Sequence, residues 1–201
     1  QIIQKHLETL FHVYMIGFMP GLPFMGNINS NLSISEQMIQ IFELLLRLRQ
    51  ISIHPQIAIN GLKKKRNDIV YPDFNKNSSK LNKILEIVKS KINNGVRENT
   101  IIFCYFKDEM NFIKKMLENN KIKSEIYDGS LNIKQKQNVL NQFVETNTLN
   151  ILSSNIYIPN NCRENIDFYI PKVLIIQIKS GSVGLNLQKF NNIIFTLPDW
   201  N

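Results

Sequence analysis

The sequence has few cysteines and few histidines, and this scarcity excludes several classes of protein. Its 201 residues contain two cysteines, Cys104 and Cys162, which cannot form the disulfide framework of a small secreted domain and suit a reducing compartment. The three histidines, His6, His12 and His54, lie apart from one another without the spacing of metal ligands. We therefore expect no metal site built from these residues.

Long apolar runs are also missing. No stretch is long enough to span a bilayer, and no signal peptide is visible, so we expect an intracellular chain without membrane contact. The first residue is glutamine, which indicates a piece of a longer polypeptide. With 24 Lys and Arg against 16 Asp and Glu, the net charge is +8, which favours a polyanion as partner, nucleic acid first.

A phosphate-binding loop is the third absence. The chain has no Gly-x-x-x-x-Gly-Lys-Ser/Thr pattern and no Asp-Glu pair suited to a nucleotide-bound metal. We infer that these 201 residues lack the machinery that binds and hydrolyses a nucleoside triphosphate.

The amino-terminal part predicts a helical extension over residues 1–60. Its second helix begins at Ser33 or Ser35, and His54-Pro55 ends it. Residues 61–78 then predict a basic linker, in which the cations from Lys63 to Arg66 form either a solvated loop or a stretch that follows a phosphate backbone.

From residue 79 onwards the pattern predicts an α/β domain. After a first helix that ends at Gly95, apolar strands alternate with amphipathic helices, and this alternation is typical of a parallel sheet covered on both faces. We predict strands at 100–106, at 123–127, from Val173 and at 192–196, and helices at 108–119 and 132–144. Residues 146–171 form an insertion long enough to have a small hairpin of its own.

The strand from Val173 is followed by Lys179 and then by the small residues Ser-Gly-Ser (180–182). In an open α/β sheet, ligands bind at the loops that follow the carboxyl ends of the strands. On spacing alone this loop is either a plain strand-to-helix turn or such a ligand loop.

Several blocks in order resemble the second RecA-like lobe of Swi/Snf-type DNA translocases, a branch of the superfamily 2 helicases. The resemblance spans residues 44–201. Its specific parts are Leu-Arg-Leu-Arg-Gln (46–50) with His54-Pro55, and Lys-Ser-Gly-Ser-Val-Gly-Leu-Asn-Leu (179–187). Weaker parts are residues 101–106, 127–130 and 198–201.

The resemblance implies a RecA-like sheet, truncated before its last motif, and roles for particular residues. It implies contacts to the DNA backbone for Lys179, Ser180, Gly181, Ser182 and Lys136. It implies a place beside the nucleotide cleft for Gly184 and Asn186, and a structural or interlobe role for Arg47, Arg49, Gln50, Asp128 and Gly129. For Asp128 the alternative of a turn residue and helix cap is favoured by the Asp-Gly pair.

The partners implied are DNA, bound without sequence preference, and the first RecA-like lobe of the same polypeptide. ATP and Mg²⁺ would act in the complete two-lobe protein, in the nucleus or at a site of viral or cytoplasmic DNA metabolism. Four positions depart from the family pattern, namely Gln177, Cys104, Tyr105 and Leu197. They keep open a non-catalytic nucleic-acid-binding or scaffold module, and the fold alone also allows an RNA-dependent superfamily 2 enzyme.

These inferences predict that residues 1–201 alone neither bind ATP well nor hydrolyse it, because the phosphate loop and the arginine finger would lie elsewhere in the polypeptide. A phosphate-release assay with and without DNA checks this. Turnover by the purified fragment above a no-protein blank would contradict it.

Overall fold

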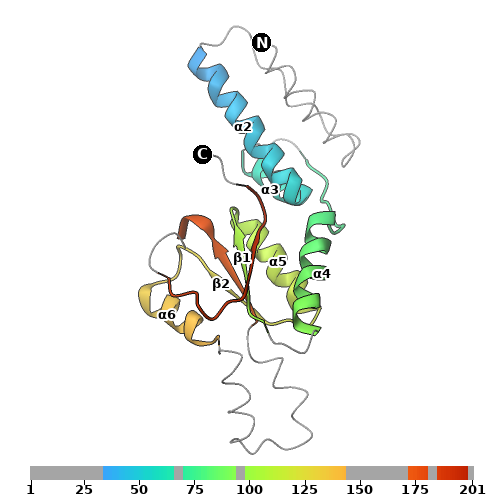
Figure 1. Cartoon of the computed structure of the whole chain (residues 1–201). Helices are drawn as coiled ribbons and strands as arrows, with labels where there is room; N and C mark the ends of the chain where they lie inside the picture. Colours follow the sequence, from blue (N-terminus) through green and yellow to red (C-terminus); the bar gives the residue numbers. More distant parts are fainter. Residues whose placement is uncertain (1–33, 66–69, 94–97, 144–171, 181–184, 199–201) are drawn as a thin grey trace, which may run out of the picture. The chain divides into compact units, whose positions relative to one another are not determined.

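A computed structural model describes residues 34–65, 70–93, 98–143, 172–180 and 185–198 (Figure 1). The chain divides into two compact units, residues 1–80 and residues 81–201. None of the helices in the described ranges is long and apolar enough to cross a membrane.

The described part of the amino-terminal unit is built on two helices. Helix α2 spans Ile34–Ile53 and α3 spans Pro55–Lys65, so the prediction that His54-Pro55 ends the first of them is confirmed. Proline suits the first position of α3 because the amide hydrogen that it lacks has no partner within the helix there. The core residues are Leu44, Ile51, Ala58, Ile59, Leu62 and Tyr71.

The prediction that residues from 61 onwards form a linker is wrong for Gly61–Lys65, which complete α3. Lys63 Nζ lies 2.6 Å from Asp73 Oδ1, and Lys65 is paired with Glu43. Burial of Leu62 holds this last turn against the core, and the lysines face carboxylates of the same unit. Arg66 lies outside the described residues.

Arg47 is buried where α2 meets α3, with 8% of its surface exposed. Its Nη1 donates to Gln50 Oε1 at 2.8 Å, and its Nη2 donates to the Gly61 carbonyl oxygen at 3.3 Å. A Cβ atom on Gly61 would lie 1.9 Å from Arg47 Nη1. Glycine at position 61 therefore makes room for the guanidinium.

We predict that Gly61→Ala destabilises the protein by about 1–2 kcal/mol, because the displaced guanidinium loses buried hydrogen bonds. In an Arg47→Ala background the same change is expected to stabilise the protein by up to about 1 kcal/mol, since alanine is the better helix former. Denaturant unfolding of the two single variants and the double variant measures both signs. The same sign in both backgrounds would contradict the packing argument.

His54 joins the helix junction to the segment that follows α3. Its Nδ1 accepts a hydrogen bond from Gln56 N at 3.1 Å, and its Nε2 lies 3.0 Å from the Lys76 carbonyl oxygen. Its ring meets Phe74 edge-on at 5.4 Å between centroids. Burial lowers the pKa of His54, although the hydrogen bond to Lys76 opposes this shift. The histidine is therefore a structural residue in its neutral form.

Because the folded state binds a proton on His54 more weakly than the unfolded chain does, protonation favours unfolding. We predict that the His54 contribution to stability is complete above the unfolded pKa of about 6.5 and is lost as the pH falls below it. Thermal unfolding at a series of pH values, compared with His54→Gln, measures this. Equal slopes for the two proteins between about pH 5 and 8 would refute the assignment.

The carboxyl-terminal unit contains a parallel sheet, as predicted. Strands β1 (Thr100–Cys104), β2 (Ser124–Tyr127), β3 (Val173–Gln177) and β4 (Asn192–Phe195) are arranged in the order β2-β3-β1-β4. All three strand pairs are parallel. Strand β3 is buried along Val173–Ile176, as its apolar run predicts.

Strand β1 ends two residues before the predicted position 106. The carboxylate of Glu109, a fully buried residue, accepts the backbone N–H groups of Tyr105 at 2.9 Å and Phe106 at 3.2 Å. Glu109 belongs to the first turn of α5 (Lys107–Asn119), so this carboxylate stabilises the turn from strand to helix.

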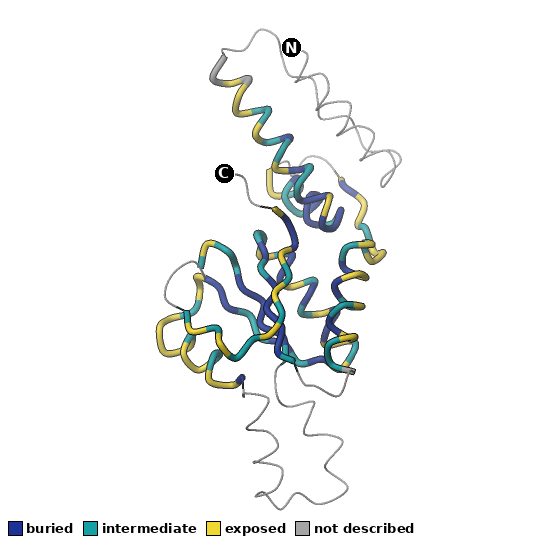
Figure 2. The backbone as a smooth tube through the Cα atoms, in the orientation of Figure 1, coloured by how far each residue is buried: buried dark blue, intermediate teal, exposed yellow. Residues whose placement is uncertain are grey.

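Helices cover both faces of this sheet (Figure 1). Helices α4 (Ser79–Asn93) and α5 (Lys107–Asn119) pack on one face, with a core that includes Ile84, Val88, Ile113, Leu117 and Ile175. Helix α6 (Ile133–Asn141) packs on the other face, against Ile101, Tyr127, Leu174 and Ile176, with Phe143 just after it. Figure 2 shows the central strands buried and α6 mostly exposed. The predicted insertion at 146–171 lies outside the described residues.

Candidate functional site

The loops that follow β2 and β3 meet at the carboxyl edge of the sheet. Strand β3 runs into a short 3₁₀ turn, Ile178–Ser180. A Cβ atom on Gly129, in the loop after β2, would lie 3.4 Å from Ser180 Oγ. Lys179 beside it is exposed. The structure therefore brings together three residues that the sequence singled out in two separate motifs.

Asp128 holds the loop after β2 in shape. It is 7% exposed and its Oδ1 accepts hydrogen bonds from Ser130 N at 3.0 Å and Ser130 Oγ at 2.5 Å. Its Oδ2 lies 3.2 Å from Lys107 Nζ. Burial opposes ionisation, but the hydrogen bonds from Ser130 and the charge of Lys107 together hold the pKa of Asp128 below its ordinary value. This geometry agrees with the turn role that the Asp-Gly pair favours.

Lys107 belongs to this edge, and the sequence reasoning missed it. Lys107 is the exposed first residue of α5, which begins shortly after the end of β1. Its ammonium group forms an ion pair with Asp128. Because β3 lies between β1 and β2, the ion pair crosses the end of β3. The available signal was its position directly after a predicted strand, where parallel sheets place functional side chains.

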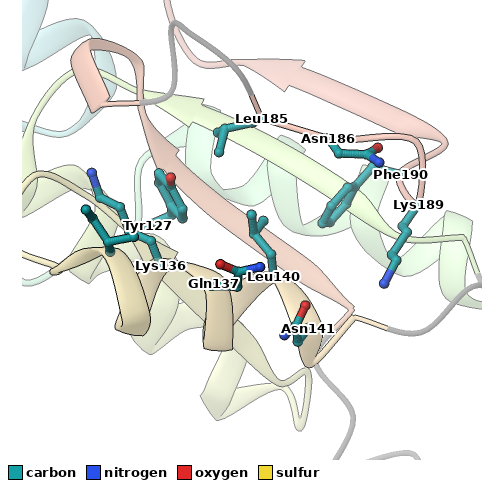
Figure 3. Close-up of a pocket in the computed structure, with 10 residues that line it drawn as sticks. Tyr127, Lys136, Gln137, Leu140, Asn141, Leu185, Asn186, Lys189 and Phe190 are labelled. Carbon is teal, nitrogen blue, oxygen red and sulfur yellow. The ribbon is translucent and has the colours of Figure 1, made fainter.

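Two further predicted residues, Lys136 and Asn186, lie together in a different place. Both line a hollow of about 530 Å³ between α6 and residues 185–190 (Figure 3). Asn186 is exposed, and its Oδ1 accepts a hydrogen bond from Gln188 N at 3.2 Å. Gly181, Ser182 and Gly184 lie outside the described residues.

Arg47, Arg49 and Gln50 belong to the amino-terminal unit. Arg47 and Gln50 are buried and hydrogen-bonded to each other, and Arg49 is half-buried. A guanidinium that is already enclosed by its own unit is poorly placed to bind phosphate. The surroundings of Arg47 and Gln50 therefore agree with a structural role for these residues. A contact of these residues with another lobe stays a prediction.

The structure describes the surroundings of three of the four departures from the family pattern, Cys104, Leu197 and Gln177. Cys104 is fully buried, as expected for a small apolar residue, and burial, with the nearby charge of Glu109 second, raises the pKa of its thiol well above the ordinary value. Leu197 is buried, and Gln177 Oε1 accepts a weak hydrogen bond from Ser180 Oγ at 3.4 Å. Within the described ranges, no three His, Cys, Asp or Glu residues come together as a metal site.

One family of helicase domains and several known proteins are similar to this chain. The family of helicase conserved C-terminal domains matches residues 79–157. A probable global transactivator of Orgyia pseudotsugata multicapsid polyhedrosis virus is 26% identical over 159 residues, covering 79% of this chain and 27% of that protein. An uncharacterized ATP-dependent helicase of Mycoplasma genitalium is 27% identical over 163 residues, covering 81% of this chain and 12% of that protein.

The DNA repair protein RAD5 of Candida glabrata is 23% identical over 137 residues, covering 66% of this chain and 10% of that protein. The chain thus spans about a quarter or less of the length of these relatives. A carboxyltransferase domain family (subdomain C and D) also matches residues 1–38, of which the structure describes only 34–38.

Two solved structures share the fold. The Sulfolobus solfataricus SWI2/SNF2 ATPase C-terminal domain superposes with a TM-score of 0.59 at 19% identity, covering 96% of this chain and 67% of that chain. The Sulfolobus solfataricus SWI2/SNF2 ATPase core in complex with dsDNA gives a TM-score of 0.58 at 18% identity, covering 95% of this chain and 32% of that chain. The chain therefore shares the fold of these C-terminal domains.

We predict that Asp128→Ala destabilises the protein by about 1–2 kcal/mol, because both donors of Ser130 lose their acceptor. Asp128→Asn keeps an acceptor oxygen and loses only a partly exposed ion pair, so we expect it to cost less than about 1 kcal/mol. Urea unfolding of the two variants separates hydrogen bonding from charge. If Asn costs as much as Ala, the charge of Asp128 matters more than its hydrogen bonds.

Proposed function

Since the chain is the C-terminal RecA-like lobe of a Swi/Snf-type helicase of superfamily 2, we propose that the complete protein is an ATP-dependent DNA translocase or helicase. Residues 1–201 would form its second motor lobe, and a first RecA-like lobe would lie elsewhere in the polypeptide. The two lobes would close on DNA and reopen in each cycle, which moves the protein along the backbone.

The observation that carries the proposal is the meeting of two loops at the carboxyl edge of the sheet. Gly129 approaches Ser180 closely, and the exposed Lys179 stands next to it. Small residues let a phosphate approach the backbone, and the lysine supplies a charge that recognises no base. This combination suits a sequence-independent contact to the DNA backbone through Lys179 and Ser180. We propose the same contact for Gly181 and Ser182, which follow them in the sequence.

ATP and Mg²⁺ fit the complete protein better than this lobe alone. Asn186 is exposed and can offer its amide to a nucleotide at the edge of a cleft, and we propose Gly184 and Asn186 for that position. A triphosphate with its metal needs a phosphate loop and acidic ligands, and the sequence has no phosphate loop. ATP supplies the free energy of movement when it is bound between both lobes.

A DNA motor of this family would act where DNA is repaired, transcribed or remodelled. The relatives include a DNA repair protein and a probable transactivator of a virus. We propose that the protein works in the nucleus or at a site of viral or cytoplasmic DNA metabolism.

The decisive experiment uses the full-length protein. We predict that Lys179→Ala raises the DNA concentration needed for half-maximal ATPase stimulation at every DNA sequence, because a phosphate contact is lost. The dependence of log K for DNA on log salt should become shallower by about 0.9, the share of one phosphate. Measurement of stimulated ATPase and of DNA affinity at several salt concentrations gives both values.

Lys89→Ala is the matched control, because Lys89 is an exposed lysine on α4 and belongs to neither loop. It should leave the affinity and the salt slope unchanged. Equal effects of the two variants would show that only overall charge matters. A full-length protein whose ATPase does not respond to DNA would instead favour a scaffold and overturn the proposed function.

A further inference from the structure

A second feature of the carboxyl-terminal unit is the hollow between α6 and the segment that precedes β4. Its volume is about 530 Å³, which lies in the range of ligand pockets. Side chains from β2, from α6 and from residues 185–190 line it (Figure 3). The lining residues are Tyr127, Ile133, Lys136, Gln137, Leu140, Asn141, Leu185, Asn186, Lys189 and Phe190.

Half of the lining residues are apolar or aromatic, and we call Tyr127, Leu140 and Phe190, which lie between Lys136 and Lys189 in Figure 3, the apolar floor. The Tyr127 side chain is packed into the core, with 4% of the residue exposed, and Phe190 packs against Phe143 at 4.9 Å between ring centroids. No residue of α6 is buried, and Ile133 at the rim is 83% exposed. The helix thus leaves apolar surface that the described chain does not cover.

Two cations flank this apolar floor. Lys136 and Lys189 lie at opposite ends of the hollow (Figure 3). Lys136 Nζ lies 5.3 Å from the centre of the Tyr127 ring, and Lys189 Nζ donates one hydrogen bond to the Phe143 carbonyl oxygen at 3.3 Å. No lining residue is acidic, and no ion pair joins either lysine to a carboxylate within the described ranges.

Amide side chains complete the rim. Gln137, Asn141 and Asn186 are exposed around the hollow, and they can donate to and accept from the main chain of an extended segment. The chemistry that complements the hollow is therefore an apolar side chain between two negative charges.

A polynucleotide fits these features less well. Bases bind to exposed aromatic faces, but the ring of Tyr127 is buried and has Lys136 over it. A sugar-phosphate backbone would satisfy the lysines and leave the apolar floor empty. A peptide supplies both carboxylates and an apolar anchor.

We propose that this hollow binds a short acidic peptide segment of a partner protein, with one or two apolar side chains seated on the floor between Lys136 and Lys189. Asn186 lines the hollow and is also the residue proposed beside the nucleotide, but Lys179 and Ser180 do not line the hollow, and peptide binding is measured without ATP or DNA. Failure of the motor assignment and failure of this site are therefore distinguishable.

The test uses the 201-residue chain and fluorescein-labelled peptides in a polarisation assay. The probe is Gly-Asp-Glu-Asp-Leu-Phe-Glu-Asp-Gly, together with versions in which Leu-Phe is replaced by Ile-Leu, Tyr-Leu or Trp-Leu. One control peptide has Ser-Ser in place of Leu-Phe, and another has Asn and Gln in place of the acidic residues. An unlabelled DNA duplex and an unlabelled oligothymidylate serve as competitors.

We expect saturable binding of at least one acidic-apolar peptide and much weaker binding of both controls. Lys136→Ala and Lys189→Ala should each raise the dissociation constant about three- to tenfold, because each removes a charged hydrogen-bond donor. Lys134→Ala is the matched control, since Lys134 is an exposed lysine of α6 that does not line the hollow. Melting temperatures of the variants verify that the fold is retained.

Three results would overturn the proposal. One is the absence of saturable binding of every peptide up to about 1 mM. Another is an equal loss with Lys134→Ala, or equal binding of the Ser-Ser peptide, because either shows non-specific attraction by charge. The third is displacement of the peptide by DNA together with an equal loss of DNA affinity in Lys136→Ala, which assigns the hollow to the DNA backbone instead.

Discussion

The burial of β3 in the middle of a parallel sheet is the constraint on which the candidate sites depend. Its residues Val173–Ile176 are fully enclosed, with β2 on one side, β1 on the other and helices over both faces. A parallel strand in that position delivers its carboxyl end to the same edge as its neighbours. The loop at Lys179 and Ser180 therefore meets the loop at Gly129, although about fifty residues separate them in the sequence.

At this edge of the sheet, the carboxylates and the lysines have different roles. Glu109 and Asp128 are buried and accept backbone and hydroxyl hydrogen bonds, so their charges serve to fix the turns after β1 and β2. The lysines stay exposed, as Lys107 and Lys179 do. An edge whose carboxylates are buried and whose lysines are exposed attracts polyanions. This agrees with the excess of positive charge in the whole chain.

The amino-terminal unit shows why a motif alone does not identify a contact. Arg47 belongs to a block with repeated cations, yet it is buried and bonded to Gln50 and to the Gly61 carbonyl oxygen. Leaving the donors of a buried guanidinium without acceptors is costly, and both terminal nitrogens of Arg47 find acceptors within its own unit. Lys63 and Lys65 likewise have carboxylate partners that lie ten and twenty-two residues away in the chain.

The sequence by itself determined the class of fold, because apolar periodicity shows which residues need burial. The pattern predicts, to within a few residues, the strands that begin at 100, 124, 173 and 192 and the helices at 107–119 and 133–141. It also determined the strand-end loops as candidate sites. It missed Lys107 and the carboxylate of Glu109, and it treated the end of α3 as a linker, because these depend on partners distant in the sequence. Only the tertiary structure decided that Lys136 and Asn186 share a hollow, since the packing of α6 on the sheet brings together side chains fifty positions apart.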